Sequence, residues 1–179
     1  MSTTTNPDAR RPDRPSRLAL GLGGNLGETR WTFRRTLDQL AQRLGPLEVA
    51  PLYRTAPISP IPQPDYLNTA VLAAVPAGSP HDLLAFLKDL ERAAGRDPEA
   101  PRWGPRPLDL DLLLWGEREI STPELTVPHP RLRERRFVLA PLADLAPDFP
   151  VPPDGISVAE WLARLEDDPQ AVTRVSWEE

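Results

Sequence analysis

The stretch from Arg102 to Leu114, RWGPRPLDLDLLL, constrains the fold more than any other part of this chain. Apolar and acidic residues alternate in it, with Asp109 and Asp111 set between leucines. A period of two predicts a β-strand that places the leucines on one face and both carboxylates on the other. Side chains two positions apart on one face lie roughly 7 Å from each other, so the two carboxylates are close enough to bind hard cations together. The leucines of the predicted apolar face are Leu108, Leu110, Leu112 and Leu114.

The two acids also have a simpler interpretation, an edge strand whose acidic face is solvated. The residues just upstream favour the metal site, because Arg102 and Arg106 come directly before the strand. Arginine together with Mg²⁺ is a combination by which proteins hold a polyphosphate. The stretch therefore predicts a metal-dependent site for a phosphorylated substrate.

The composition narrows the class of protein. A chain of 179 residues that is 40% hydrophobic is long enough for one domain with a proper core, which we expect at 17–179 after a disordered, polar tail at 1–16. The net charge of −5 argues against a nucleic-acid binder, and no apolar run approaches the roughly 18 residues of a membrane helix. A soluble, cytoplasmic protein is expected. The absence of cysteine excludes disulfides and thiol catalysis, and two distant histidines argue against a histidine-based metal site.

Hydrophobic periodicity predicts the element order β-α-β-β-α-β. The predicted strands are 17–23, 47–55, 66–75 and 108–114, and the predicted helices have the inner faces Phe33, Leu37, Leu40, Leu44 and Leu83, Leu87, Leu90, Ala94. Ser79 and Pro80 are typical of a helix start, and Gly45 and Gly95 of helix ends. This order is that of an α+β, ferredoxin-like core, an antiparallel sheet with helices packed on one face.

The remaining segments form a proline-rich loop and a C-terminal extension. Five prolines at 56–65 predict an extended, exposed loop. After the core we expect a short helical piece near 131–145, a helix started by a capping box of Ser157 and Glu160, and a last strand at 172–175.

Three further motifs are ambiguous when each is taken alone. The glycine-rich turn at 21–27 resembles a dinucleotide-binding motif, but Leu26 stands where the third glycine of that motif belongs. A tight turn with close backbone approach is therefore the better interpretation. Asn68 is either a ladder-end hydrogen bonder or a partner for a heteroaromatic edge. His129, between two prolines, is expected on a stiff turn that presents its ring outward, and Phe137 is expected in the core.

Taken together, these segments resemble the 6-hydroxymethyl-7,8-dihydropterin pyrophosphokinase family of folate biosynthesis. The resemblance covers about residues 18 to 147, and its RWGPR-x-LDLD string is highly specific. The matching pieces are Gly24-Asn-Leu-Gly27, Tyr53-Arg-Thr55, Gln63-Pro-Asp-Tyr-Leu-Asn68, Gly95-Arg96, Arg102 to Asp111, and Pro128-His129 with Arg135, Arg136 and Phe137.

The resemblance implies transfer of pyrophosphate from ATP to the hydroxymethyl group of the reduced pterin, with release of AMP. It implies that Asp109 and Asp111 hold two Mg²⁺ ions and that Arg96, Arg106 and Asp111 are catalytic. The residues that it places against ATP are Glu91, Arg96, Arg102, Arg106, Leu112, Thr126, His129 and Arg135. Those that it places around the pterin are Thr55, Asn68, Trp103 and Phe137. We expect a monomer with ATP and the reduced pterin as its partners and neither nucleic acid nor membrane.

Some positions depart from the family's pattern. Gly24 replaces a usual serine, and Pro98 stands where many members have a second arginine. Asp97, Glu99 and Pro101 imply a more acidic and stiffer loop. Two rival functions are a catalytically inactive nucleotide-binding protein on the same scaffold and a proline-rich interaction module. The intact acids and arginines argue against the first, and the scattered prolines of the loop lack the repeat that the second needs.

Overall fold

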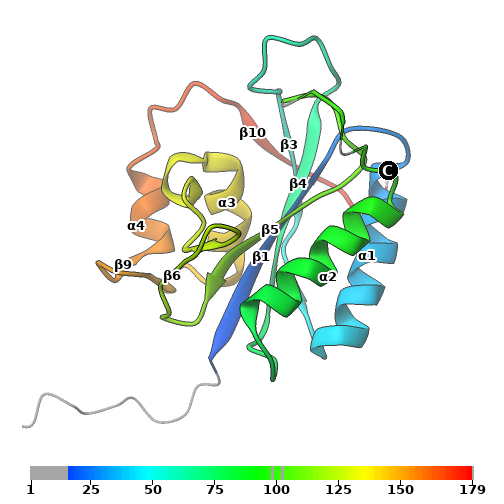
Figure 1. Ribbon diagram of the computed structural model, residues 1–179. Helices are drawn as coiled ribbons and strands as arrows, with labels where there is room; N and C mark the ends of the chain where they lie inside the picture. The colour runs from blue at the N-terminus through cyan, green and yellow to red at the C-terminus, as the bar shows by residue number, and fades with distance from the viewer. Residues whose placement is uncertain (1–15, 98, 102, 179) are drawn as a thin grey trace, which may run out of the picture.

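An antiparallel sheet forms the centre of the molecule. The computed structural model describes residues 16–97, 99–101 and 103–178, and the tail predicted for 1–16 lies outside them apart from Ser16. The strand order is β10-β3-β4-β1-β5, and β2 also pairs with β4 (Figure 1). The strands are β1 (Arg17–Gly24), β2 (Glu48–Val49), β3 (Leu52–Thr55), β4 (Tyr66–Ala74), β5 (Asp109–Trp115) and β10 (Val172–Val175).

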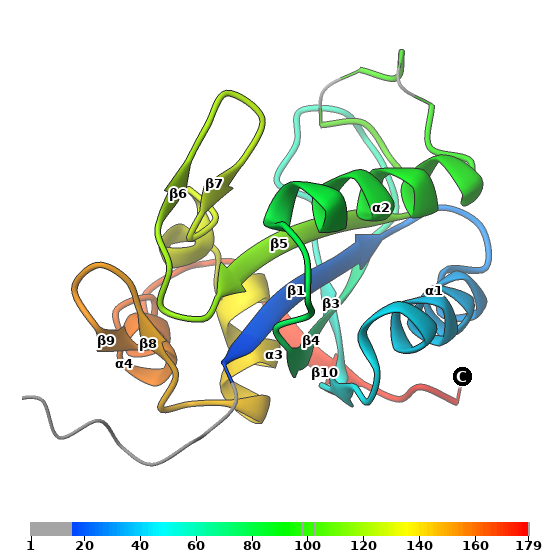
Figure 2. The same cartoon turned by 60° about the horizontal axis from the view of Figure 1, so that its bottom comes forward.

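Two helices, α1 (Thr29–Leu44) and α2 (Pro80–Ala93), pack on one face of this sheet (Figure 2). Their predicted inner faces are confirmed, since the apolar side chains of both helices join the buried cluster beneath them. A capping box between Ser79 and Asp82 starts α2, and Gly95 follows its end with a φ of 89°. The predicted βαββαβ core is therefore confirmed. Strand residues of this cluster include Leu18, Leu20, Leu22, Leu110 and Leu112, and Leu108, directly before β5, joins them.

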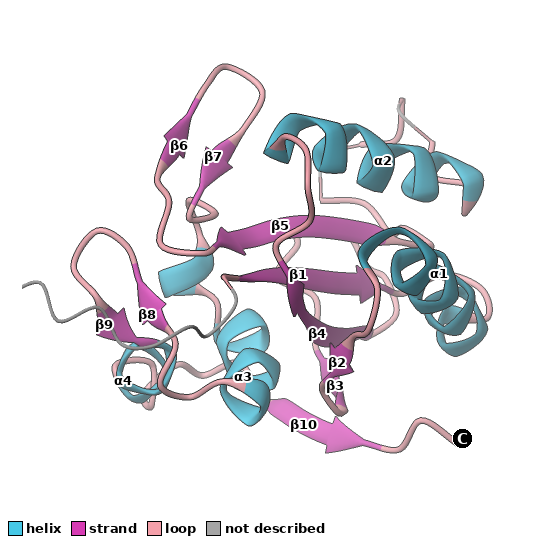
Figure 3. Cartoon of the chain, turned by 90° about the horizontal axis from the view of Figure 1, so that it is seen from below, coloured by secondary structure: helices cyan, strands magenta, loops and turns pink. Residues whose placement is uncertain are grey.

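The C-terminal extension adds a second helical layer on the opposite face of the sheet. Its helices, α3 (Arg136–Leu145) and α4 (Val158–Ala163), lie across the sheet from α1 and α2 (Figure 3). A second buried cluster joins them to the sheet through side chains such as Leu72 and Leu139. The predicted capping box of Ser157 and Glu160 starts α4. The extension also contains the 3₁₀ turn Leu132–Glu134, which leads into α3.

Two predictions about the strands are corrected by the structure. A β-bulge between β1 and β5 shifts the register, so that Ala19 pairs with Leu114 and Leu20 with Leu112. Leu114 therefore packs into the second cluster rather than sharing a face with Leu112. The strand predicted at 47–55 is split into β2 and β3 around Pro51, which has no N–H to donate to a ladder.

Two short hairpins were not predicted. They are β6 (Ile120–Ser121) with β7 (Thr126–Val127), and β8 (Pro150–Val151) with β9 (Ile156–Ser157). The predicted last strand is confirmed as β10, which pairs with the outer edge of β3. No helix among the described residues is long and apolar enough to cross a membrane.

Candidate active site

A cavity of ≈550 Å³ lies over one end of the sheet. Its wall comes from β1, β3, β4 and β5, from α2, from the proline-rich loop, from the segment before β5 and from the start of α3. Most of the side chains that the sequence singled out meet here, although they are scattered over more than 80 positions of the chain. Those lining the cavity are Thr55, Asn68, Arg96, Trp103, Arg106, Asp109, Asp111, His129, Arg135 and Phe137.

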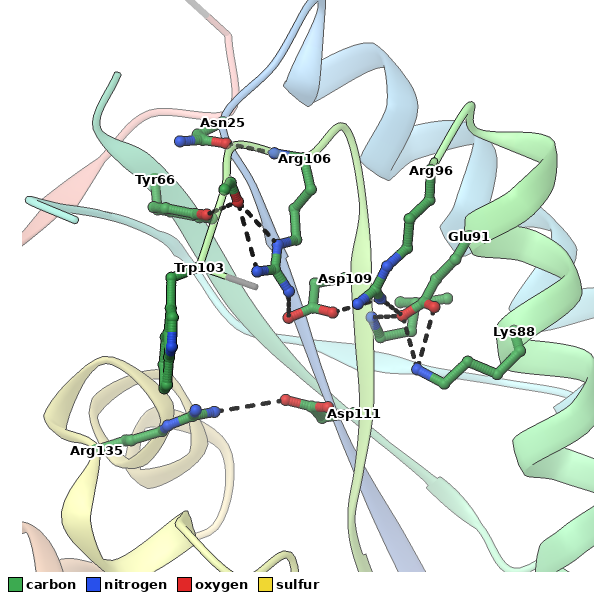
Figure 4. Close-up of polar contacts among 12 residues, drawn as sticks. Asn25, Tyr66, Lys88, Glu91, Arg96, Trp103, Arg106, Asp109, Asp111 and Arg135 are labelled. Atoms are coloured by element: carbon green, nitrogen blue, oxygen red, sulfur yellow. Dashed lines mark hydrogen bonds and ion pairs between the residues drawn. The ribbon is translucent and has the colours of Figure 1, made fainter. Parts of the chain in front are cut away.

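Asp109 and Asp111 share one face of β5, as predicted, and each carboxylate is surrounded by cationic groups. Asp109 Oδ1 lies 2.6 Å from Arg96 Nη1, and its Oδ2 lies 3.2 Å from Arg106 Nη1 (Figure 4). Asp111 Oδ2 lies 3.7 Å from Arg135 Nη1 and 3.8 Å from His129 Nε2. The two acids thus stand in line, with arginines from three different segments around them.

Arg106 is held by the turn that follows β1. Its backbone N–H donates to Asn25 Oδ1 at 2.8 Å, and its carbonyl accepts from the Asn25 N–H at 2.9 Å. A Cβ at Gly24 would lie 2.6 Å from the Pro107 carbonyl oxygen, so this close approach requires glycine. Although burial disfavours the charged form, Asp109 and Tyr66 raise the pKa of Arg106 above its ordinary value.

Glu91 lies behind this row of charges and not on the cavity wall. Its side chain is 2% exposed, and its Oε1 accepts from the buried Leu110 N–H at 2.7 Å. Arg96 Nη1 lies 2.7 Å from the same oxygen, and Lys88 Nζ donates to both carboxylate oxygens. Glu91 therefore fixes Arg96 and the start of β5 from the side of α2, as Figure 4 shows.

His129 points into the site, so the outward orientation expected from its flanking prolines is wrong. Its Nδ1 accepts from the Arg131 N–H at 3.2 Å, which leaves Nε2 to carry the proton of the neutral ring. Burial lowers the pKa of His129 below 6.5 despite the attraction of Asp111. His129 also lines a neighbouring cavity of ≈280 Å³, to which Thr126 and Arg133 contribute.

The residues that the resemblance places around the pterin line the same cavity. The Asn68 Nδ2 donates to Thr55 Oγ1 at 2.9 Å, and both side chains are nearly buried. Gly23 pairs with Asn68 across the sheet, and a Cβ there would lie 3.2 Å from Asn68 Oδ1. Glycine at this position therefore leaves the amide oxygen uncrowded. Phe137 is half-buried beside the second cluster, with the Arg135 guanidinium 5.5 Å from its ring centroid.

Trp103 is held between two parts of the wall. Its carbonyl accepts from Ser59 Oγ at 3.1 Å and from Gln63 Nε2 at 2.9 Å, both in the proline-rich loop. The Arg131 guanidinium stacks over its ring at 4.8 Å. Its φ of 70° is rare for a residue with a side chain. The proline-rich loop and the RWGPR segment are thus joined at the cavity mouth.

Not every predicted residue lines this cavity. Leu112 is buried in the core beneath β5, Thr126 lies in the neighbouring cavity, and Arg102, like Pro98, is outside the described residues. Sequence reasoning missed Lys88 and Gln170, which line the cavity from α2 and from the segment before β10. Lys88 had a signal, because it is the only lysine in the chain.

The donor set fits magnesium shared with a substrate. Two carboxylates on one strand face supply hard oxygen ligands, and Mg²⁺ is commonly held by one or two carboxylates with phosphate oxygens completing its shell. In the part of the chain that the structure describes, no group of three or more His, Cys, Asp or Glu side chains gathers as a closed metal cage.

Known proteins resemble this chain in sequence and in fold. The model of the 7,8-dihydro-6-hydroxymethylpterin-pyrophosphokinase (HPPK) family matches residues 19–147. A 2-amino-4-hydroxy-6-hydroxymethyldihydropteridine pyrophosphokinase of Pseudomonas aeruginosa is 44% identical over 151 residues, which are 82% of this chain and 90% of that protein. One of Methylorubrum extorquens is 40% identical over 162 residues.

Other relatives are longer. The mitochondrial folate synthesis bifunctional protein of Arabidopsis thaliana is 44% identical over 146 residues, and the match spans a quarter of its length. A solved Plasmodium falciparum HPPK-DHPS superposes with a TM-score of 0.67 at 12% identity, covering 88% of this chain and 43% of that one, which shows the shared fold. With the family match over most of the sequence and the paired acids, arginines and aromatic wall at one cavity, the chain belongs to the 7,8-dihydro-6-hydroxymethylpterin-pyrophosphokinase family.

Proposed function

We propose that this chain transfers the terminal diphosphate of ATP to the hydroxymethyl group of 6-hydroxymethyl-7,8-dihydropterin, releasing AMP, as a step of folate biosynthesis. The observation that carries the proposal is that Asp109 and Asp111 line one cavity together with the polar pair of Thr55 and Asn68. Arginines from three separate segments contact the two acids.

The triphosphate of ATP lies along the row of charges. His129 belongs to both cavities, so an adenosine near Thr126 in the smaller one has its phosphates directed past His129 toward Asp111. Arg96 and Arg106 are both paired with Asp109. When nucleotide and metal bind, the arginines exchange this carboxylate for phosphate oxygens, which guanidinium groups hold in bidentate geometry.

Asp109 and Asp111 are the residues that would hold Mg²⁺, and we propose two ions. Magnesium bound there supplies positive charge to the triphosphate, and so lowers the cost of the charge that develops during phosphoryl transfer. The arginines supply the rest of that charge from fixed positions: Arg106 through its backbone bonds to Asn25, and Arg96 through the buried Glu91. We propose that Glu91 acts on ATP through Arg96 and that Leu112 supports the adenosine side from the core.

The pterin occupies the part of the cavity that Thr55 and Asn68 line. Asn68 presents an acceptor oxygen beside Gly23 and has one N–H left after bonding Thr55, so it matches a heterocycle edge that carries both donors and acceptors. Phe137 and Trp103 provide aromatic surface for stacking against the ring. With the ring held there, its hydroxymethyl group faces the acids on β5.

The reaction then consists of one displacement. The hydroxymethyl oxygen forms a bond to the β-phosphorus, the bond between that phosphorus and the oxygen bridging it to the α-phosphorus breaks, and AMP leaves with that oxygen. The proton of the hydroxyl is lost, and Asp111 is the candidate to receive it. Positioning and charge neutralisation carry most of such a reaction, which explains why the site is built of cations and acids on rigid elements.

We further propose a cytoplasmic, monomeric enzyme, and that Arg102 is an additional phosphate contact. The intact acids and arginines argue against an inactive nucleotide-binding protein on the same scaffold. Calorimetric titration with a non-hydrolysable ATP analogue and then with the pterin tests the assignment. The proposal requires Mg²⁺-dependent binding of the analogue and binding of the pterin to the same molecule. An inactive nucleotide binder takes the analogue alone, and an interaction module binds neither.

A further inference from the structure

The cavity wall contains one residue from the C-terminal segment that follows α4. Gln170 lines the cavity together with Thr55, Ala56 and Pro57, the residues at the end of β3. Among the described residues that line it, Gln170 alone comes from beyond Val138. It also lies outside residues 19–147, which the family model matches. Its contribution to the site therefore comes from a part of the chain that the family model does not match.

Only one of the two polar atoms of the Gln170 carboxamide has a hydrogen-bond partner among the described residues. Its Nε2 donates to the Ala56 carbonyl at 2.9 Å, which ties the C-terminal segment to the wall next to Thr55. Its Oε1 is buried and has no hydrogen-bond partner among the described residues. An unpaired buried acceptor is unfavourable unless a bound molecule supplies a donor.

The segment carrying Gln170 is firmly fixed to the protein. The backbone N–H of Gln170 donates to Asp168 Oδ1, and two residues later Val172 pairs with Thr55 at the start of the β10–β3 ladder. At the far end, Trp177 Nε1 donates to the Ala50 carbonyl. Gln170 is therefore held in place from both sides, so its side chain can set the position of a ligand.

We propose that Gln170 is a specificity-determining residue of the pterin subsite. Its nitrogen positions the Ala56 carbonyl at the cavity wall, and its oxygen accepts a hydrogen bond from an N–H donor on the edge of the heterocycle. Asn68 and Thr55 hold the same wall from the sheet, so the ring is recognised from both sides of β3. This inference rests on the proposed function, because it assigns the Thr55 side of the cavity to a reduced pterin.

The test compares Gln170→Met, which keeps the length of the side chain and removes both hydrogen-bonding atoms, with Gln42→Met, the same change at an exposed position of α1. The full chain is saturated with Mg²⁺ and a non-hydrolysable ATP analogue and titrated with 6-hydroxymethyl-7,8-dihydropterin. We expect Gln170→Met to raise the Kd of the pterin roughly three- to tenfold, the effect of losing one or two hydrogen bonds. The Kd of the ATP analogue should match that of Gln42→Met, and the thermal midpoint should fall by only about 2–4 °C, the cost of the lost hydrogen bond to Ala56.

A second variant guards against a folding defect. Gln170→Asn keeps the amide but withdraws it by one methylene from Ala56, and we expect a similar loss of pterin affinity with unchanged nucleotide affinity. Pterin affinity within twofold of the unaltered protein in both variants would overturn the inference, as would a parallel loss of pterin and nucleotide binding. Failure of the unaltered protein to bind the pterin at all would instead overturn the proposed function, so the two failures are distinguishable.

Discussion

Replacing Glu91 is the perturbation whose magnitude follows most directly from the structure. Its carboxylate is 2% exposed and bonds the Leu110 N–H, Arg96 and Lys88. In Glu91→Ala the Leu110 N–H loses its buried acceptor, which costs about 1–3 kcal/mol. The freed cations add about 1 kcal/mol or less, because Arg96 and Lys88 are 30% and 44% exposed and can return to water. We therefore expect Glu91→Ala to lower the free energy of unfolding by about 1–4 kcal/mol.

A conservative change separates the hydrogen bond from the charge. Glu91→Gln keeps an oxygen for the Leu110 N–H, and the neutral bond replaces a charge-assisted one, so the loss should be about 1 kcal/mol. Chemical denaturation measures both values, and Glu117→Ala, at an exposed position in the loop after β5, serves as the control with a change within about 0.5 kcal/mol. Because Arg96 loses its support, turnover should fall in both Glu91 variants.

The reasoning is refuted if Glu91→Ala is as stable as Glu117→Ala. It is also refuted if Glu91→Gln weakens nucleotide binding while leaving stability unchanged, because that result belongs to a direct contact with ATP and not to a buried support.

Two further predictions concern charges elsewhere. Asp109→Asn and Asp111→Asn should each reduce turnover roughly a hundredfold or more. Each should change the free energy of unfolding by about 1 kcal/mol or less, because the ion pairs of both acids are partly exposed. Steady-state rates and melting curves check this, and full activity in either variant would contradict the metal assignment. Hydrogen bonds from Ser79 lower the pKa of Asp82 below its ordinary value of 3.8, and the bond from the Ser79 backbone contributes most. The stability it contributes is therefore present above that value and is lost as pH falls through the lower folded pKa. Asp82→Asn should be less stable than the parent at pH 7 and approach it in acid, whereas a gap that widens below pH 3.8 would contradict the cap.

Local patterns in the sequence account for most of the fold. The spacing of Phe33, Leu37 and Leu40, the cap at Ser79 and the alternation at Leu110 each reflect an interaction within a few residues, so they could be predicted. The reversal at Leu114 could not, because a bulge depends on the partner strand. The second helical layer was missed for the same reason, since nothing local says which face α3 covers.

The sequence predicted which chemical groups form the site, but not which of them are buried or how they contact one another. The face shared by Asp109 and Asp111 followed from a period of two, and the resemblance brought distant arginines to it. Three features of the site depend on long-range contacts. Glu91 is buried against Arg96, His129 faces Asp111, and Gln170 of the C-terminal segment bonds Ala56. A sequence pattern carries no record of such contacts, so only the folded chain shows them.

The most direct test of the proposed function is the identity of the nucleotide product. The unaltered chain is incubated with Mg·ATP and 6-hydroxymethyl-7,8-dihydropterin, and AMP, ADP and remaining pterin are quantified by chromatography. Attack at the β-phosphorus predicts one AMP formed for each pterin consumed, no pterin-dependent ADP, and loss of both changes together in Asp111→Asn. ADP as the nucleotide product would show attack at the γ-phosphorus, and ATP left unchanged by the pterin would show no transfer; either result would contradict the assignment.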